Sequence, residues 1–207
     1  MGLQCLRHCA QNPNIEHVHV FCRTPSKLSA EDKQLCASVL TGNARIQQDV
    51  EKAMRESKAN YVILATGNGA DLKKSDTREK TGQALAMAMA KSEFKNVKTI
   101  VVSSHGASDT KIIVGMGIGW MIAKHLKFVL ADHTEQEKAF VNTMDRTLIV
   151  RPTALSDDKG GSKIVEFDGT VKSPSINVDR SDVAAYIVDA IAAASFTGRK
   201  VCITNAK

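Results

Sequence analysis

Continuous apolar runs alternate with amphipathic or alanine-rich stretches along most of the chain. Three of these runs have the length and flanking turn residues of strands buried on both faces, at 61–65, 99–103 and 147–150. Shorter strands are predicted at 17–22, 44–48 and 201–203, and helices at 3–11, 30–40, 50–57, 76–91, 134–142 and 182–194. This alternation predicts the α/β fold class, with a doubly wound parallel sheet that has helices on both faces.

The last third of the chain carries turn signals of its own. Asp168-Gly169 lies between two short extended stretches, 163–167 and 170–172, which predicts a small C-terminal hairpin at the substrate region. Ser181 is predicted to cap the last helix, with Asp182 favourably placed in its first turn.

Composition and charge narrow the range of partners. The chain has 207 residues, of which 43% are hydrophobic and 24% charged, as is ordinary for one globular domain. The net charge of +6 favours anionic partners such as phosphorylated cofactors. Aromatic residues make up only 4% and no run of five Lys or Arg occurs, so nucleic acid is not expected as a partner.

Cysteine and histidine positions indicate neither a disulfide framework nor a metal site. The five cysteines form no C-x-x-C pair and are interpreted as free thiols of a reducing compartment. His17 and His19 share one face of a strand, but no further ligands accompany them, so no metal is expected. No apolar stretch approaches the ~18 residues that span a bilayer. We therefore expect a cytoplasmic protein without a membrane partner, and the oligomeric state is left open.

The turns after the predicted strands are the expected ligand site, because parallel sheets bind ligands at the carboxyl ends of their strands. These turns begin at Arg23, Thr66, Ser103 and Arg151, and we expect them to line one crevice that takes a small-molecule substrate. Arg23 has Thr24 beside it and Lys27 four residues on. An Arg at this strand end suits the 2′-phosphate of NADP, whereas an acid suits NAD. A plain surface Arg is the alternative interpretation.

Two further turns are candidates for the cofactor. Asp49 and Val50 follow the strand predicted at 44–48, where the carboxylate or its backbone would contact an adenine. Asp49 equally suits a helix cap, and the two roles are compatible. Thr66-Gly67 follows a buried strand, and a glycine there lets the backbone approach a pyrophosphate or ribose closely. A plain turn is the alternative.

Candidate catalytic residues follow the second buried strand and lie on a later helix. Ser103 and Ser104 would polarise a substrate carbonyl with a hydroxyl, and helix capping is the alternative. His133 shares a helix face with Glu137, which predicts a catalytic or substrate-binding pair or else a solvated face. The run Gly115-x-Gly-x-Gly119 is weak as a nucleotide motif and is interpreted as a flexible loop over the cleft.

Eight short motifs occur along the chain, at 2–6, 21–28, 48–50, 65–67, 102–104, 131–133, 148–152 and 179–184. In this order they resemble the NmrA-like atypical short-chain dehydrogenases of the biliverdin reductase B/flavin reductase type. The resemblance covers nearly the whole chain. Each motif is weak singly, and the shared order is the specific part.

The resemblance implies a single NAD(P)-binding domain over 1–207 with a Rossmann-like sheet, and NADP(H) as cofactor in preference to NAD. In that family Arg23 would meet the 2′-phosphate, Asp49 and Val50 the adenine, and Thr66 and Gly67 the ribose–phosphate side. Gly2 would correspond to the third glycine of a Gly-x-x-Gly-x-x-Gly turn. The strand and most of the loop before it are then absent, and that strand belongs between 17–22 and 61–65.

At the nicotinamide end, the resemblance implies that Ser103 and Ser104 lie near the ring and that Arg151-Pro152 closes the site. Asp132-His133 would border the substrate pocket. The implied reaction is hydride transfer from NADPH to a small conjugated acceptor: a flavin, a quinone or a tetrapyrrole. The Tyr-x-x-x-Lys pair of ordinary short-chain dehydrogenases is absent. The chain therefore equally suits a non-catalytic NADP-binding regulator, and its missing loop suits a cofactor-free truncated protein.

Overall fold

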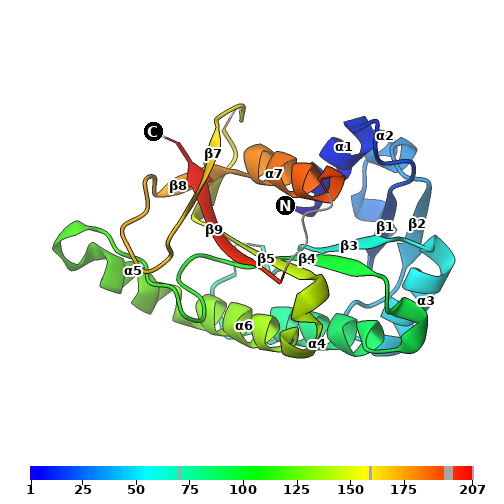
Figure 1. Ribbon diagram of the computed structural model, residues 1–207, viewed down its shortest axis with the longest axis horizontal. Helices are drawn as coiled ribbons and strands as arrows, with labels where there is room; N and C mark the ends of the chain where they lie inside the picture. The colour runs from blue at the N-terminus through cyan, green and yellow to red at the C-terminus, as the bar shows by residue number, and fades with distance from the viewer. Residues whose placement is uncertain (70, 159, 194–197, 207) are drawn as a thin grey trace.

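A five-stranded sheet forms the centre of the protein, and helices cover both of its faces (Figure 1). The computed structural model describes residues 1–69, 71–158, 160–193 and 198–206. The first four strands run parallel, and the last pairs antiparallel with its neighbour. In spatial order they are β3 (Tyr61–Leu64), β4 (Lys98–Val102), β5 (Thr147–Pro152), β9 (Lys200–Asn205) and β7 (Ile164–Phe167). The mostly parallel α/β sheet predicted from the apolar runs is confirmed.

Two apolar clusters hold the helices against this sheet. On one face lie α1 (Gly2–Gln11) and α7 (Arg180–Ala192); on the other lie α3 (Gln47–Ser57), α4 (Thr77–Met89) and α6 (Lys127–Lys138) (Figure 1). Successive residues of a strand point to opposite faces. Ile100 of β4 is accordingly buried in the first cluster, with α7, while Val101 is buried in the second, with α4.

A separate two-stranded sheet lies beside β3. It consists of β1 (His19–Cys22) and β2 (Ser38–Thr41), which pair in parallel. Among the described residues no sheet pairing joins β1 to β3, so the two sheets are distinct. This gap between β1 and β3 falls where the resemblance to the NmrA-like family implies a further strand.

The segment between β1 and α3 differs from its prediction. The helix predicted at 30–40 is only α2 (Ala30–Gln34), whose first turn is capped by the Ser29 hydroxyl accepting the Asp32 N–H at 3.0 Å. The strand predicted at 44–48 is wrong, because β2 occupies 38–41 and α3 begins at Gln47. Val39 and Thr41 favour extended backbone, and pairing with β1 decides the outcome.

The predicted C-terminal hairpin does not form. β7 pairs with β9, and residues 170–172 form no strand. The Gly169 carbonyl instead accepts the Lys111 N–H at 2.9 Å, and a Cβ at Gly169 would lie 2.5 Å from Thr110. This close packing against the 110 segment carries the chain away from β7.

The last helix begins one residue before its predicted cap. The N-cap of α7 is Asp179, whose carboxylate accepts the Ser181 N–H at 2.7 Å, so the predicted cap at Ser181 is wrong. Asp182 lies in the first turn, as predicted. The helix ends at Ala192, and residue 194 of the predicted range lies outside the described residues.

The long connection from β4 to β5 is helical. A 3₁₀ turn, η3 (Gly115–Gly117), leads into α5 (Ile118–His125), and α6 follows. The helix predicted at 134–142 is therefore the end of α6 followed by a 3₁₀ segment, η4 (Val141–Arg146). The remaining elements are η1 (Pro25–Lys27), η2 (Ser92–Phe94) and the parallel pair β6 (Ala154–Ser156) and β8 (Asn177–Asp179). Within the described ranges, no helix combines the length and apolar character needed to span a bilayer.

Candidate functional site

The turns after β3 and β4 lie with the last residues of β5 at the carboxyl edge of the central sheet. The Ser103 N–H donates to the Val150 carbonyl at 2.8 Å, and the His105 N–H donates to the Pro152 carbonyl at 2.9 Å. These bonds continue the pairing with β5 beyond the end of β4, so the Ser103-Ser104 turn lies directly beside Arg151-Pro152. The turn predicted to begin at Arg151 is wrong, because Arg151 and Pro152 are the last residues of β5. The Thr66-Gly67 turn follows β3, the other neighbour of β4.

The carboxyl end of β1 carries two exposed cations. Arg23 and Lys27 are exposed, and within the described part of the chain neither side chain has a hydrogen bond or an ion pair. Thr24 is exposed between them. Cationic groups that no acid neutralises are suited to holding a phosphate.

The turn after β2 lies beside Arg23, and it was missed by the sequence interpretation. The Gly42 N–H donates to the Cys22 carbonyl at 3.2 Å, which places Gly42 and Asn43 next to the end of β1. A Cβ at Gly42 would lie 2.6 Å from the Phe21 ring, so the backbone approaches that ring more closely than another residue type permits. The signal for this turn is the Gly-Asn pair after Val39-Leu40-Thr41, a pair typical of turns.

Asp49 and Val50 lie inside α3 and do not follow a strand. The N-cap of α3 is Ile46, so the suggested capping position for Asp49 is wrong. The Asp49 carboxylate accepts the Asn43 N–H at 2.8 Å, and it thereby shapes the turn after β2. Val50 is buried in the apolar cluster under α4. An adenine contact by either residue stays a prediction.

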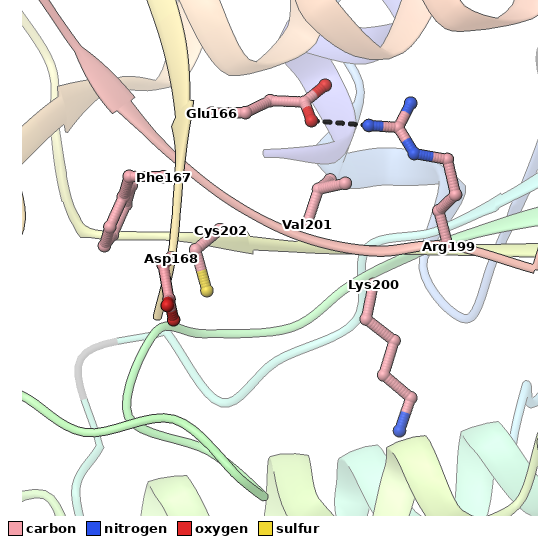
Figure 2. A pocket seen from close by; sticks show the side chains of 7 residues that line it. All are labelled: Glu166, Phe167, Asp168, Arg199, Lys200, Val201 and Cys202. Carbon is pink, nitrogen blue, oxygen red and sulfur yellow. Dashed lines mark hydrogen bonds and ion pairs between the residues drawn. The ribbon is translucent and has the colours of Figure 1, made fainter. Parts of the chain in front are cut away.

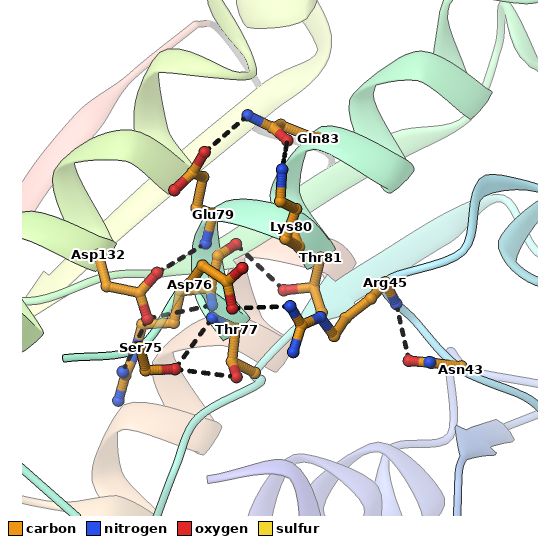
Figure 3. A network of polar contacts seen from close by, with 11 residues as sticks. Asn43, Arg45, Ser75, Asp76, Thr77, Glu79, Lys80, Thr81, Gln83 and Asp132 are labelled. Atoms are coloured by element: carbon orange, nitrogen blue, oxygen red, sulfur yellow. Dashed lines mark hydrogen bonds and ion pairs between the residues drawn. The ribbon is translucent and has the colours of Figure 1, made fainter. Parts of the chain in front are cut away.

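The N-terminus of α4 links the two sheets (Figure 3). Arg45, in the turn after β2, donates to the carboxylate of Asp76, the N-cap of α4, at 2.7 Å. From α6, Asp132 accepts the backbone N–H of Arg78 at 3.1 Å and that of Glu79 at 2.9 Å. The turn after β2 therefore contacts the start of α4, a helix that packs on the central sheet.

Arg78 lies directly against the turn after β3. A Cβ at Gly67 would be 3.1 Å from Nη2 of Arg78, and Thr66 Oγ1 is 2.7 Å from Thr81 Oγ1. The guanidinium is buried and ion-paired with Asp132, while its Nε has no partner among the described residues. Sequence reasoning missed Arg78, because nothing in a helix sequence shows which strand end it reaches.

A buried ion pair holds the Ser103 turn. Arg151 donates from Nε to Glu137 Oε1 at 2.9 Å and from Nη2 to Oε2 at 2.6 Å. The Ser103 and Ser108 hydroxyls donate to the same carboxylate, at 2.6 and 2.7 Å, and Asp109 also binds Arg151. Burial raises the pKa of Glu137, but the bonds from Arg151 and the two serines outweigh burial and lower it. Glu137 is therefore ionised.

The other catalytic candidates differ in accessibility. His133 is buried, and burial together with the nearby Arg78 charge lowers its pKa to about 3, so it is neutral at physiological pH. Its Nδ1 has no partner among the described residues, and its predicted partner Glu137 binds Arg151 instead. Ser104 is half-buried, and its hydroxyl donates to the His105 carbonyl at 3.1 Å. The catalytic roles stay predictions.

A family model described as NAD(P)H-binding matches residues 1–194, which is most of the chain. The chain belongs to this NAD(P)H-binding family. A search among curated proteins gave no match.

Solved structures share the fold of this NAD(P)H-binding chain at low sequence identity. The oxidoreductase ylbE from Lactococcus lactis has a TM-score of 0.75 at 18% identity, covering 100% of this chain and 86% of its own. A short-chain dehydrogenase/reductase from Veillonella parvula in complex with NADP has 0.73 at 16%, covering 98% and 88%. ChuY, an anaerobillin reductase from Escherichia coli, has 0.72 at 18%, covering 99% and 91%. Likeness at these identities shows the Rossmann-like fold.

The residues at the strand ends fit the cofactor class of this NAD(P)H-binding family. Arg23 and Lys27 are exposed cations, and Gly42, which has no side chain, lies next to the end of β1 that carries Arg23. Gly2 is the first residue of α1, whose N-terminus has no side-chain cap, and a Cβ there would meet nothing within 4 Å. Such a helix end favours negative charge.

A separate recess of about 400 Å³ lies one strand away from Arg151, between β7 and the start of β9 (Figure 2). Its lining is mostly polar, and Glu166 forms an ion pair with Arg199 and accepts the Tyr186 hydroxyl at 2.7 Å. Burial raises the pKa of the Cys202 thiol to about 11. A thiol of this kind is a poor nucleophile at neutral pH. Among the described residues no group of His, Cys, Asp or Glu is placed to hold a metal ion.

Proposed function

We propose that this protein is an NAD(P)H-dependent oxidoreductase that binds NADPH in preference to NADH and reduces a small conjugated acceptor. The observation that carries the proposal is the pair of exposed cations at the carboxyl end of β1, Arg23 and Lys27, without acidic partners among the described residues. A 2′-phosphate is the feature that separates NADP(H) from NAD(H), and a guanidinium offers it paired donors.

The remaining strand ends have distinct roles in this proposal. Asn43, beside Arg23, would contact the adenosine, and Asp49 holds its backbone in place. The Thr66-Gly67 turn with Arg78 beside it would hold the ribose–phosphate side, and the open N-terminus of α1 at Gly2 would face the pyrophosphate. When bound, NADPH supplies a hydride.

At the reacting end, the protein's own part is to position groups and to exclude water. The Glu137–Arg151 pair fixes the turn that carries Ser103 and Ser104. Of these two serines, Ser104 has the more accessible hydroxyl, and we assign it the contact with the acceptor. His133 is neutral, because its pKa is lowered to about 3. We assign it a supporting role in the wall of the site.

A flavin, a quinone or a tetrapyrrole is the proposed acceptor class. The resemblance of the short motifs to the biliverdin reductase B/flavin reductase type supports this class. Among the solved structures with the same fold, the reductase ChuY is named for an anaerobillin, which supports a tetrapyrrole. The proposed location of such an activity is the cytoplasm.

Calorimetric titration of the purified 207-residue chain with NADPH and, in parallel, with NADH tests the proposal. We expect saturable binding of NADPH and weaker binding of NADH. Turnover is then followed as loss of NADPH absorbance with a flavin, a quinone and a linear tetrapyrrole offered separately. A folded chain that binds neither nucleotide would overturn the proposal and would favour a cofactor-free protein.

A cofactor-binding regulator without chemistry is the second candidate. Three observations favour it: the Ser103 hydroxyl donates to Glu137, Arg151 is buried with the same carboxylate, and His133 is neutral. NADPH binding without turnover of any acceptor would select the regulator. If turnover occurs, Ser104→Ala is expected to lower it more than it lowers NADPH affinity, with Ser92→Ala, on the surface far from the site, as the control.

A further inference from the structure

An apolar arm extends from one end of the molecule. We define the arm as residues 111–128, which comprise an extended stretch, η3, α5 and the turn into α6. Figure 1 shows α5 beyond the end of the central sheet, and its main packing partners are η3 and α6. Its surface is apolar: Trp120 is 67% exposed and Met121 64%, and further exposed apolar side chains are Ile113, Ile118, Ile122 and Phe128.

Within the arm, the backbone of α5 packs closely on the backbone of the extended stretch before it. Gly119 of α5 lies against the extended stretch, since a Cβ there would be 2.2 Å from the Ile112 carbonyl oxygen. Gly117 begins the helix with φ +76°, a conformation that favours glycine. The helix is therefore held with its glycine inward and its large apolar side chains outward. Apolar side chains exposed to this extent more often form a binding surface than serve no function.

The charges on the arm are all of one sign. Residues 111–131 include Lys111, Lys124 and Lys127 and contain no Asp or Glu. The Lys124 Nζ lies 5.0 Å from the centre of the Trp120 ring, and the Lys127 Nζ lies 4.7 Å from that of Phe128. These contacts place a cation beside each of two exposed aromatic rings.

The exposed apolar side chains and the lysines beside them together decide the kind of partner. A second copy of the chain would bring the same lysines against each other, because a two-fold interface pairs identical patches. Repulsion then opposes burial of the apolar residues. An anionic surface with an apolar interior has the opposite effect, because it attracts the lysines and accepts the tryptophan and isoleucines together. The net charge of +6 adds long-range attraction to such a surface.

We propose that the arm docks this protein onto the surface of a bilayer that contains anionic lipids, with Trp120, Met121 and Ile118 in the headgroup region and Lys124 and Lys127 on lipid phosphates or carboxylates. The cytoplasmic leaflet carries such lipids, so the proposal suits the predicted location. It departs from the expectation that the protein has no membrane partner. It goes beyond the oxidoreductase function and does not depend on it.

The single tryptophan of the chain gives a direct readout, since Trp120 lies on the arm. The full chain is titrated with vesicles of phosphatidylcholine alone and with vesicles containing about one third phosphatidylserine. We expect a blue shift of the Trp emission and co-sedimentation with the anionic vesicles only. Both effects weaken as salt is added, because exposed charges are screened.

Two variants test the two components of the surface. Lys124→Glu with Lys127→Glu is expected to weaken vesicle binding at least ~tenfold, because two attractive charges become repulsive. The matched control, Lys33→Glu with Lys95→Glu, changes the net charge equally at exposed sites off the arm and is expected to keep most of the binding. Ile118→Ser with Met121→Ser removes apolar area and is expected to abolish the blue shift. Circular dichroism checks that each variant is folded.

Several outcomes would overturn the proposal. The first is a wild-type chain that stays in the supernatant when either kind of vesicle is sedimented. The second is equal loss of binding in the Lys124→Glu, Lys127→Glu variant and in its control variant, since it would show that binding depends only on the net charge. The third is a blue shift without lipid that grows with protein concentration, since it would identify a second copy as the partner. NADPH titration of the same samples is independent of all three.

Discussion

Arg151 and Glu137 join the end of β5 to α6 through two parallel hydrogen bonds, Nε to Oε1 at 2.9 Å and Nη2 to Oε2 at 2.6 Å. Both side chains are nearly fully buried, and the Ser103 hydroxyl donates to the same carboxylate at 2.6 Å. The pair therefore fixes the turn after β4, which is one wall of the proposed cofactor site. The sequence predicted Arg151 at the nicotinamide end and Glu137 as a partner of His133 or part of a solvated face, whereas the structure pairs Arg151 and Glu137 with each other.

Removing the charge of Glu137 is expected to destabilise the fold. Glu137→Gln leaves Arg151 buried with one exposed partner, Asp109, and we expect the free energy of unfolding to fall by about 3 kcal/mol. Glu137→Met combined with Arg151→Met removes both charges and is expected to restore much of that loss. Urea unfolding at pH 7 measures both. Glu135→Gln, exposed on the same helix, is the control, and an equal loss there would contradict the prediction.

Gly42→Ala tests the close approach between the turn after β2 and the end of β1. The added Cβ would lie 2.6 Å from the Phe21 ring, so the ring must move, and we expect a loss of about 1–3 kcal/mol in the free energy of unfolding. Gly115→Ala is the matched control, because a Cβ there meets nothing within 4 Å. Equal stability of the two variants in thermal unfolding would show that the turn is not tightly packed.

His133 makes the stability depend on pH. Its pKa is lowered to about 3 by burial and by the Arg78 charge, whereas its ordinary value is 6.5. Below pH 6.5 the unfolded chain takes up a proton that the folded chain does not, so stability falls as the pH falls towards 3. The expected fall is about 2 kcal/mol between pH 7 and pH 5.

The variant that tests this effect is His133→Gln, which has no group that titrates in this range. We expect the free energy of unfolding to change less between pH 7 and pH 5 in this variant than in the wild type, by urea titration at each pH. His17→Gln, at an exposed position, serves as the control. Parallel pH profiles of the His133 variant and the wild type would refute the assignment.

Arg23→Glu tests the choice between NADPH and NADH. The change removes a phosphate partner and adds repulsion, so the dissociation constant for NADPH is expected to rise on the order of tenfold to hundredfold. NADH, without the 2′-phosphate, is expected to bind nearly as before. Lys33→Glu makes a charge reversal elsewhere on the surface and controls for net charge. Equal weakening for both nucleotides in calorimetry would remove Arg23 from the 2′-phosphate site.

The hydrophobic pattern of the sequence was sufficient to predict those elements whose structure is decided by burial alone. The runs at 61–65, 99–103 and 147–150 agree with β3, β4 and β5 to within two residues at each end, because a strand with helices on both faces is largely apolar. Short, half-buried elements were misplaced. Ser38–Thr41 is a strand through its pairing with β1, and a four-residue segment has no clear period of its own.

The sequence by itself determined the α/β alternation, the polar strand ends at Thr66 and Ser103 and the cationic turn at Arg23, because these depend on local order along the chain. Only the tertiary structure decided which polar groups are bound internally. Arg78 reaches Asp132 across 54 positions because α4 packs beside α6, and Arg151 reaches Glu137 across 14 because α6 lies against the end of β5. A buried charge must be paired, and packing alone brings its partner within reach.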